Sequence, residues 1–172
     1  MDYTKFSKDY RVRRLSNNDI PLILALCEKN PQFYEHCPPF VTAQSIKDDM
    51  KALPQRKINQ PQDKYYLGYF DKAGQLVAVM DFIDHYPTEQ SCFIGFFMME
   101  RNLQGAGIGS SIITELCEYL TELDYKYIRL GYVDSNEQSK SFWQKNQFTD
   151  TGLRNHTDDY TVVVMNRSLN KQ

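Results

Sequence analysis

The segment from residue 100 to residue 111 has the pattern best suited to chemistry, because glycine occupies alternate positions at Gly105, Gly107 and Gly109. It follows an apolar run and precedes an amphipathic one, so we expect it to join a strand to the start of a helix. A helix start presents backbone N–H groups without intrahelical partners and the positive end of the helix dipole. Glycines let the backbone curl these groups around an anion. The pattern therefore predicts a phosphate or pyrophosphate site.

Other loops share part of this composition. A strand-to-helix turn that binds nothing does not need three alternating glycines. A dinucleotide-binding Gly-x-Gly-x-x-Gly loop comes immediately after its strand. Here a mostly polar stretch intervenes, and Ser110 stands where the third glycine would be. A Walker-type loop needs Gly-Lys-Ser/Thr, and residues 102–111 contain no lysine. These alternatives therefore explain the segment less well than another kind of anion-binding loop.

The pattern Gln104-x-x-Gly107-x-Gly109 resembles the Gln/Arg-x-x-Gly-x-Gly/Ala motif of the GNAT superfamily of N-acetyltransferases. The expected order of strand, loop, helix, strand and short helix agrees with that family from about residue 10 to residue 165. The resemblance implies that acetyl-CoA is the cosubstrate and that loop amides hold its pyrophosphate. By position, these amides belong to Gln104, Gly105, Ala106, Gly107, Ile108, Gly109 and Ser110.

The resemblance also implies a role for the end of the preceding strand, at Met98 and Met99. Their backbone would pair with the pantetheine arm as though it were a neighbouring strand, and the Met99 amide would polarise the thioester carbonyl. A fixed donor aimed at a developing oxyanion stabilises the transition state. From composition alone these methionines are core residues, and both roles are compatible because side chain and backbone act separately.

Residues 136–148 resemble a later motif of the same family, Asn-x-x-Ala-x-x-Leu/Phe-Tyr-x-Lys-x-Gly-Phe. Asn136 and Phe142 match it and Ser139 replaces the small alanine, so the resemblance implies that these residues lie at the CoA arm. Trp143 stands where many members carry a tyrosine that protonates the departing thiolate. Because an indole N–H only donates a hydrogen bond, we expect Trp143 to be a packed aromatic or a wall of the thiol pocket.

The general base is harder to assign. Attack requires a neutral amine, so some group must accept a proton. The family commonly uses a glutamate on the strand before the loop, but residues 91–99 contain no carboxylate. The alternatives are Asp81, Asp84 and His85 on the preceding expected strand, where alternation places Asp81 and His85 on one face. We rank His85 first because an unperturbed histidine has a pKa near neutrality, although each of the three also fits a solvated strand end.

The elements that must position these residues follow from periodicity and turn signals. We expect strands at 10–15, 65–70, 75–85, 91–99 and 125–133, closing strands near 148 and at 160–165, and helices after Asn17 or Asn18 and over 42–53, 109–123 and 136–145. The three prolines in residues 30–40 predict a loop. Gly74 predicts a turn in which the glycine has a positive φ. The order predicts an α/β (α+β) fold with a mixed, mainly antiparallel central sheet flanked by helices.

The bulk composition limits the functional classes. A chain of 172 residues with 41% hydrophobic residues fits a single domain, residues 1–172 with a core from about 10 to 168. The net charge of −2 offers no basic field for nucleic acid or an anionic membrane. Without a signal-like start or a run of about 20 apolar residues, we expect a cytoplasmic protein. The four cysteines match no zinc or redox spacing, so we expect free thiols and no metal.

We therefore predict direct transfer of acetyl from acetyl-CoA to a primary amine on an unidentified small molecule or peptide. Glu35 and His36 lie in the proline-rich segment that borders the acceptor pocket in this family, and an ordinary exposed loop fits them equally well. The alternative is a CoA-binding regulatory domain without catalysis, motivated by the missing strand glutamate and by Trp143. A homodimer is left open.

Overall fold

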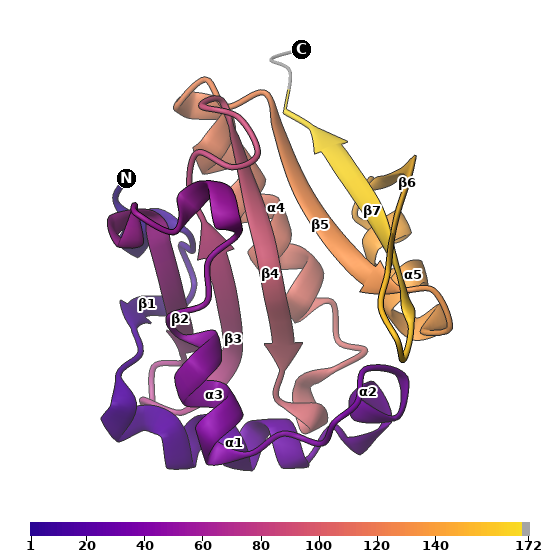
Figure 1. Ribbon diagram of the computed structural model, residues 1–172. Coiled ribbons are helices and arrows are strands. Elements are labelled where there is room, and N and C mark those ends of the chain that lie inside the picture. Colours follow the sequence, from indigo (N-terminus) through magenta and orange to yellow (C-terminus); the bar gives the residue numbers. More distant parts are fainter. Residues whose placement is uncertain (170–172) are drawn as a thin grey trace.

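The protein is built on one seven-stranded sheet with the order β1-β2-β3-β4-β5-β7-β6 (Figure 1). The computed structural model describes residues 1–169. Its strands are β1 (Arg11–Arg14), β2 (Lys64–Phe70), β3 (Leu76–Ile83), β4 (Ser91–Met99), β5 (Tyr127–Val133), β6 (Thr149–His156) and β7 (Thr161–Ser168). Only β4 and β5 pair in parallel; the other neighbours are antiparallel. The predicted mixed, mainly antiparallel sheet is confirmed.

Helices cover both faces of the sheet (Figure 1). The α-helices are α1 (Ile20–Glu28), α2 (Pro31–His36), α3 (Ala43–Asp49), α4 (Ile108–Glu122) and α5 (Glu137–Lys145). Short 3-10 turns are η1 (Tyr3–Lys5), η2 (Asn17–Asp19), η3 (Gln55–Lys57), η4 (Pro61–Asp63) and η5 (Arg101–Leu103). Residues of α1 and α3 pack in one hydrophobic cluster, and residues of α4 and α5 pack in the other. The sheet therefore separates two cores.

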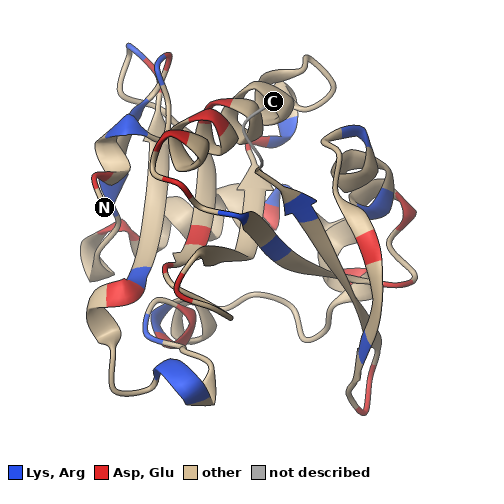
Figure 2. Ribbon diagram, turned by 90° about the horizontal axis from the view of Figure 1, so that it is seen from above, with Lys and Arg blue, Asp and Glu red and all other residues tan. Residues whose placement is uncertain are grey.

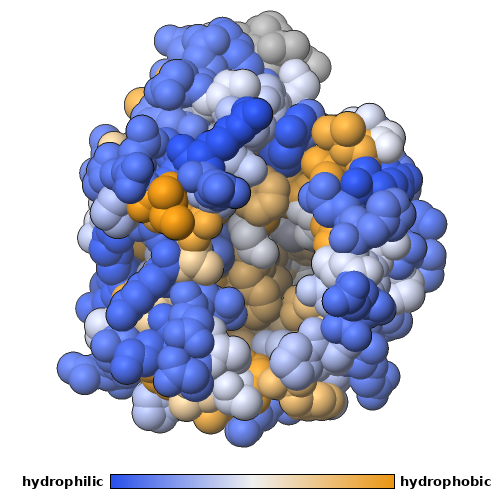
Figure 3. Space-filling model, in the orientation of Figure 1, coloured by the Kyte–Doolittle hydropathy of each residue, from blue (hydrophilic) through white to orange (hydrophobic). Residues whose placement is uncertain are grey.

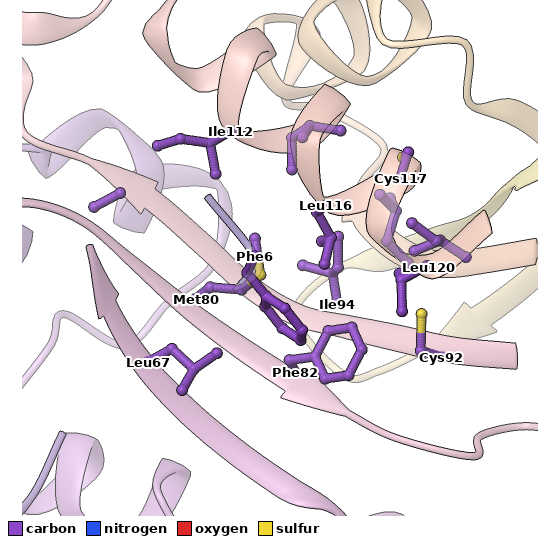
Figure 4. Packing of buried hydrophobic residues seen from close by; sticks show 14 of the residues in the cluster. Phe6, Leu67, Met80, Phe82, Cys92, Ile94, Ile112, Leu116, Cys117 and Leu120 are labelled. Carbon is purple, nitrogen blue, oxygen red and sulfur yellow. The ribbon is translucent and has the colours of Figure 1, made fainter. Parts of the chain in front are cut away.

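The larger core lies between the sheet and α4. Ile112, Ile113, Leu116, Cys117 and Leu120 are buried, which confirms the predicted apolar stripe of that helix. Their side chains meet strand residues such as Met80, Phe82 and Ile94 (Figure 4). This packing fixes α4, and with it the loop at its N-terminus, against the middle of the sheet.

Local signals explain several element ends. The Thr42 side chain accepts a hydrogen bond from the Ser45 amide at 3.0 Å and Ser45 Oγ accepts one from the Thr42 amide at 2.9 Å, so Thr42 caps α3 as predicted. Gly74 has φ +80° in the turn between β2 and β3, which confirms that prediction.

Charges of both signs are spread over the elements (Figure 2). In the part of the chain that the structure describes, no helix is long and apolar enough to cross a membrane.

Two boundary predictions were wrong. Residues 30–40 were expected to form a loop, but α2 occupies residues 31–36. Pro31 stands in its first turn, where a missing N–H costs no hydrogen bond. The strand expected to reach residue 85 ends at Ile83. His85 has φ +50° and lies beyond the ladder, so the alternation that placed it on one face with Asp81 does not apply.

The sheet opens in the middle. Residues Ser91–Ile94 of β4 pair with Tyr127–Leu130 of β5, and the two strands then diverge (Figure 1). On the other side of β4, Asp81 pairs with Phe96 while Phe82 pairs with Ile94, so Gly95 is the extra residue of a β-bulge. The bulge and the divergence occur at the same level of β4. They leave a V-shaped opening between β4 and β5, which we call the splay.

Candidate functional site

A cavity of about 800 Å³ runs from the glycine loop along the end of β4 to α2 and α5. We call it the main cavity. Most of the residues predicted to bind the cofactor line it: Met98, Met99, Gln104, Gly105, Gly107, Gly109, Ser110, Asn136, Ser139 and Phe142. Ala106 and Ile108 belong to the same loop, but they are not among its lining residues. The fold thus brings the two motifs, more than twenty-five residues apart in sequence, to one space.

The glycine loop presents its backbone to this cavity. Gly107 is the N-cap of α4 with φ +85°, and no side chain caps the helix. Gly105 has φ +81°. A Cβ added at either glycine would meet no protein atom within 4 Å, so the space beside the backbone is open. An uncapped helix start with an open approach favours an anion, and the loop therefore fits a pyrophosphate.

A buried amide that the sequence did not single out holds this loop to the rest of the fold. Asn30 follows α1 and its side chain is buried. Its Oδ1 accepts a hydrogen bond from Gln104 Nε2 at 2.7 Å, and its Nδ2 donates to the Met99 carbonyl at 3.1 Å. Gln104 Nε2 also reaches the Met99 carbonyl at 3.2 Å. The Gln104 side chain therefore holds the loop to the end of α1 and to β4 by hydrogen bonds, whichever ligand the loop binds.

The edge of β4 facing the splay carries backbone donors. The Glu100 amide donates to the Val77 carbonyl at 2.9 Å, continuing the ladder between β3 and β4. Because amides of an antiparallel strand point alternately to its two sides, the amides of Phe97 and Met99 point toward β5. Pairing with β5 ends at Ile94, so these two amides lie on an edge without a strand beside it. An extended polar chain can pair there.

The opposite wall comes from α5. The Asn136 side chain accepts a hydrogen bond from the Ser139 amide at 2.9 Å and so caps this helix. This cap uses the Asn136 side-chain oxygen. The first turn of α5 lines the main cavity. The Phe142 ring lies 3.2 Å from where a Cβ on Gly109 would stand. Gly109 therefore serves close packing of α4 against α5, a different role from the open positions 105 and 107.

Trp143 is a packed aromatic residue. It is buried and its ring lies 4.8 Å from Phe142, 5.1 Å from Phe148 and 6.1 Å from Phe97, measured between ring centroids. It also forms part of the wall of the main cavity. Trp143 is therefore a packed aromatic residue, as expected, with part of its surface on the main cavity.

Replacing Trp143 with phenylalanine keeps an aromatic ring but removes the indole N–H and some volume. We expect kcat to fall by less than about tenfold, equivalent to about 1.4 kcal/mol, while the melting temperature falls because a gap is left among the neighbouring rings. Steady-state rates and thermal melts test this. A much larger loss of kcat at unchanged stability would instead give the N–H a direct part in the reaction.

Two of the three candidate bases lie away from the cavity. Asp84 is buried and accepts hydrogen bonds from the Tyr125 hydroxyl and from the His85 amide. The His85 ring stacks on Tyr125, and its Nδ1 lies 2.6 Å from the Glu89 carbonyl. Both residues follow the end of β3 that pairs with the start of β4, opposite the Met99 end. His85 lines neither the main cavity nor the splay pocket described below, and the residues it contacts, Asp84, Glu89 and Tyr125, line neither of them. We therefore do not retain it as the base.

Asp81 is the candidate that the fold brings to the splay. Its Oδ2 lies 2.5 Å from where a Cβ on Gly95 would stand, so the carboxylate fills the place of a missing side chain on β4. Lys64 Nζ donates to Oδ2 at 2.7 Å. Oδ1 is buried without a hydrogen-bond partner among the described residues. Burial raises the pKa of Asp81 to about 6 against the opposing effect of Lys64. A carboxylate with this pKa accepts protons near neutrality.

A smaller hollow of about 240 Å³ occupies the splay itself, and we call it the splay pocket. It is lined by Gly95 and by residues of β4, β5, β7, α2 and α5. Phe33, Phe97 and Trp143 line both hollows. Glu35 and His36 of α2 line the main cavity but not the splay pocket, and His36 Nδ1 lies 2.9 Å from Ser135 Oγ.

The remaining question at the site is whether cysteines or a metal ion could take part in the chemistry. All four cysteines are free, and Cys27, Cys92 and Cys117 are buried, which confirms the expected free thiols. Burial raises the pKa of Cys27, Cys92 and Cys117, so they stay protonated. Within residues 1–169, no group of three histidine, cysteine, aspartate or glutamate side chains is arranged to hold a metal ion.

Comparison with known proteins gives one family match. A model described as the acetyltransferase (GNAT) family matches residues 27–148. No curated protein matches the sequence. An acetyltransferase structure from Thermus thermophilus superposes with a TM-score of 0.71 at 14% identity, covering 92% of this chain and 96% of that one.

Two further solved structures are similar. Spermidine N-acetyltransferase from Vibrio cholerae, in complex with CoA and spermine, has a TM-score of 0.69 at 16% identity, with 95% and 97% of the two chains covered. The ribosomal-protein-S18-alanine N-acetyltransferase from Escherichia coli has a TM-score of 0.64 at 10% identity, with 95% and 96% covered. At these identities the likeness shows a shared fold.

Proposed function

The chain belongs to the GNAT acetyltransferase family, and we propose that it moves an acetyl group directly from acetyl-CoA to a primary amine. The observation that carries this proposal is the continuity of the main cavity. It runs from the glycine loop, whose backbone suits an anion, along the unpaired edge of β4 to Phe97 and Trp143, which also line the splay pocket. The Asp81 carboxylate lies against Gly95 of that pocket. The similar structures named as spermidine and protein-alanine N-acetyltransferases support an amine acceptor.

Each part has a task in that reaction. The amides from Gly105 to Ser110 would hold the pyrophosphate, with Arg101 and Lys145 of the cavity wall as nearby cations. The open edge of β4 would pair with the pantetheine arm, leaving the amide of Met99 or Phe97 to donate to the thioester oxygen. Such a donor stabilises the charge that develops on that oxygen during attack.

The protons that must move during the reaction determine which other groups are needed. As the amine nitrogen attacks the carbonyl carbon, a C–N bond forms, the C–S bond breaks and CoA leaves as a thiolate. The nitrogen must lose a proton, and Asp81 would accept it directly or through one water, since its carboxylate lies against Gly95 of the splay pocket. Solvent can protonate the thiolate, so Trp143 is not required as an acid.

The proposal is tested by measuring thiol release from acetyl-CoA in the presence of a broad set of primary amines, alongside calorimetric titration with acetyl-CoA. We expect binding without an amine and thiol release only when an amine is added. Tight binding without amine-dependent release across the whole set would favour the regulatory CoA-binding domain instead. Absence of binding would overturn both functions.

A further inference from the structure

The splay pocket has mainly aromatic and aliphatic walls, and Cys37, Asn136 and Ser139 are its uncharged polar residues besides the tyrosines. Its walls carry the rings of Phe33, Phe93, Phe96, Tyr132, Trp143 and Tyr160. Aliphatic side chains of β4, β5 and β7 fill the gaps between them. Figure 3 shows this face of the molecule with a recess between hydrophilic borders, coloured toward the hydrophobic end of the scale. Aromatic and aliphatic walls favour a ring or a branched hydrocarbon group.

The pocket also lacks charge. None of the described residues that line it is an aspartate, glutamate, lysine, arginine or histidine. The phenol groups of its two tyrosines remain neutral near pH 7. The Cys37 thiol beside Tyr160, together with burial, raises the pKa of that tyrosine to about 12, and burial raises the pKa of Tyr132. A charged substituent placed here would lose water without gaining an ionic partner from the lining.

A buried ion pair, Asp81 with Lys64, lies just behind the lining. At Gly95 the missing side chain leaves the Asp81 carboxylate against the backbone of the pocket wall. Oδ2 is shared with Lys64, whereas Oδ1 is buried without a partner among the described residues. A ligand with a single amine can therefore place its nitrogen at Gly95 and the rest of its body among the rings.

The pocket opens toward the reactive end of the main cavity. Phe97 and Trp143 line both hollows, and Phe97 is also one of the two β4 residues whose amide faces the splay. A nitrogen held near Gly95 is thus on the same stretch of β4 as the proposed thioester site. The volume of about 240 Å³ suits one ring with a short alkyl chain better than a long extended chain.

We propose that the splay pocket is the acceptor site and that the acceptor is a primary monoamine carried by an aromatic or branched apolar substituent. This inference rests on the proposed acetyl transfer and adds the substrate class. A polyamine would bring a second ammonium group into a pocket without a counter-charge. That group would have to be desolvated, and an aromatic wall offsets only part of the cost.

The test compares phenylethylamine with spermidine at saturating acetyl-CoA. We expect kcat/KM to be at least about tenfold higher for phenylethylamine, within the range that apolar pockets achieve. Trp143 is the only tryptophan of the chain and lines the pocket. Its fluorescence therefore reports binding of either amine to the CoA-loaded protein, whether or not turnover occurs.

A pair of variants isolates the effect of charge. Val162 lines the splay pocket from β7, and Val162→Asp and Val162→Asn differ mainly in charge. We expect both variants to bind acetyl-CoA normally and to melt at similar temperatures. Only Val162→Asp should shift the ratio of kcat/KM values toward spermidine, by about tenfold or more, because it supplies the missing counter-charge.

The outcomes separate this inference from the function on which it rests. Spermidine preferred over phenylethylamine, in both turnover and fluorescence titration, would overturn the substrate class while leaving acetyl transfer intact. An equal response of the selectivity to the Asp and Asn variants would also overturn it. If neither these nor other amines are acetylated although acetyl-CoA binds, the proposed function itself fails.

Discussion

Replacing Gly107 with valine is expected to weaken acetyl-CoA binding by about 100-fold or more, or about 2.8 kcal/mol. Gly107 has φ +85° and caps α4, and a side chain there would project into space that no protein atom occupies within 4 Å. That space is where we place the pyrophosphate. A β-branched residue also strains the positive-φ backbone, so the loop amides would be displaced. Titration calorimetry measures the loss directly.

Strain alone must be separated from loss of the site. Gly74 has nearly the same backbone conformation, with φ +80°, and it too has nothing within 4 Å of an added Cβ. It lies in the turn between β2 and β3 and lines neither hollow. Gly74→Val should therefore lower the melting temperature comparably and leave acetyl-CoA binding unchanged. Equal binding of acetyl-CoA by the two variants would contradict the proposal that the glycine loop holds the pyrophosphate.

Replacing Asp81 with asparagine is expected to lower kcat by about 100-fold or more, the usual effect of losing a general base. The amide keeps the size of the side chain and can still accept a hydrogen bond from Lys64, but it cannot take a proton. Burial raises the pKa of Asp81 to about 6. The carboxylate is ionised above that pH, so kcat/KM of the native protein should rise as pH increases through about 6. In Asp81→Asn this rise should disappear.

The charges around Asp81 come from two elements. Lys64 of β2 lowers its pKa and Asp49 of α3 raises it, while burial keeps the neighbouring Tyr66 protonated by raising its pKa. Asp63→Asn is a matched control, because Asp63 pairs with the equally buried Lys57 but, unlike Asp81, is not packed against Gly95 of the splay pocket. It should cost similar stability and retain the pH profile.

A second control addresses the histidine that the sequence favoured. His85→Gln should also keep both kcat and the rise of kcat/KM with pH (the rising limb of the pH profile), because His85 lies at the other end of β4. An unchanged limb in Asp81→Asn would contradict the assignment of the base. Loss of the limb in His85→Gln would restore the prediction made from the sequence.

The glycine loop, between a strand and a helix, could be predicted because its signals are local. The strand that ends at Met99, the alternating glycines and the apolar stripe of α4 all occur within one continuous segment. Each glycine has its own physical role, however, and sequence does not separate them. Gly107 has a positive φ and an open approach, whereas Gly109 is needed where α4 packs against Phe142.

The base that we propose, Asp81, could not be ranked first from the sequence because its position depends on strand register. The sequence shows that β4 lacks a carboxylate, but not that a bulge at Gly95 lets Asp81 of β3 occupy the empty place. The ranking of His85 assumed that the strand continued to residue 85, and it stops at Ile83. Asn30 was missed for a similar reason, since its link to Gln104 joins residues far apart in the chain.

Direct transfer of acetyl from acetyl-CoA to a primary amine can be followed with a deuterated acetyl group by mass spectrometry. Acetyl-CoA carrying that label is incubated with the protein and phenylethylamine, and both the amine and the intact protein are weighed. We expect labelled N-acetyl amine and a protein of unchanged mass throughout turnover. Label recovered only as acetate, or attached to the protein during turnover, would contradict direct transfer.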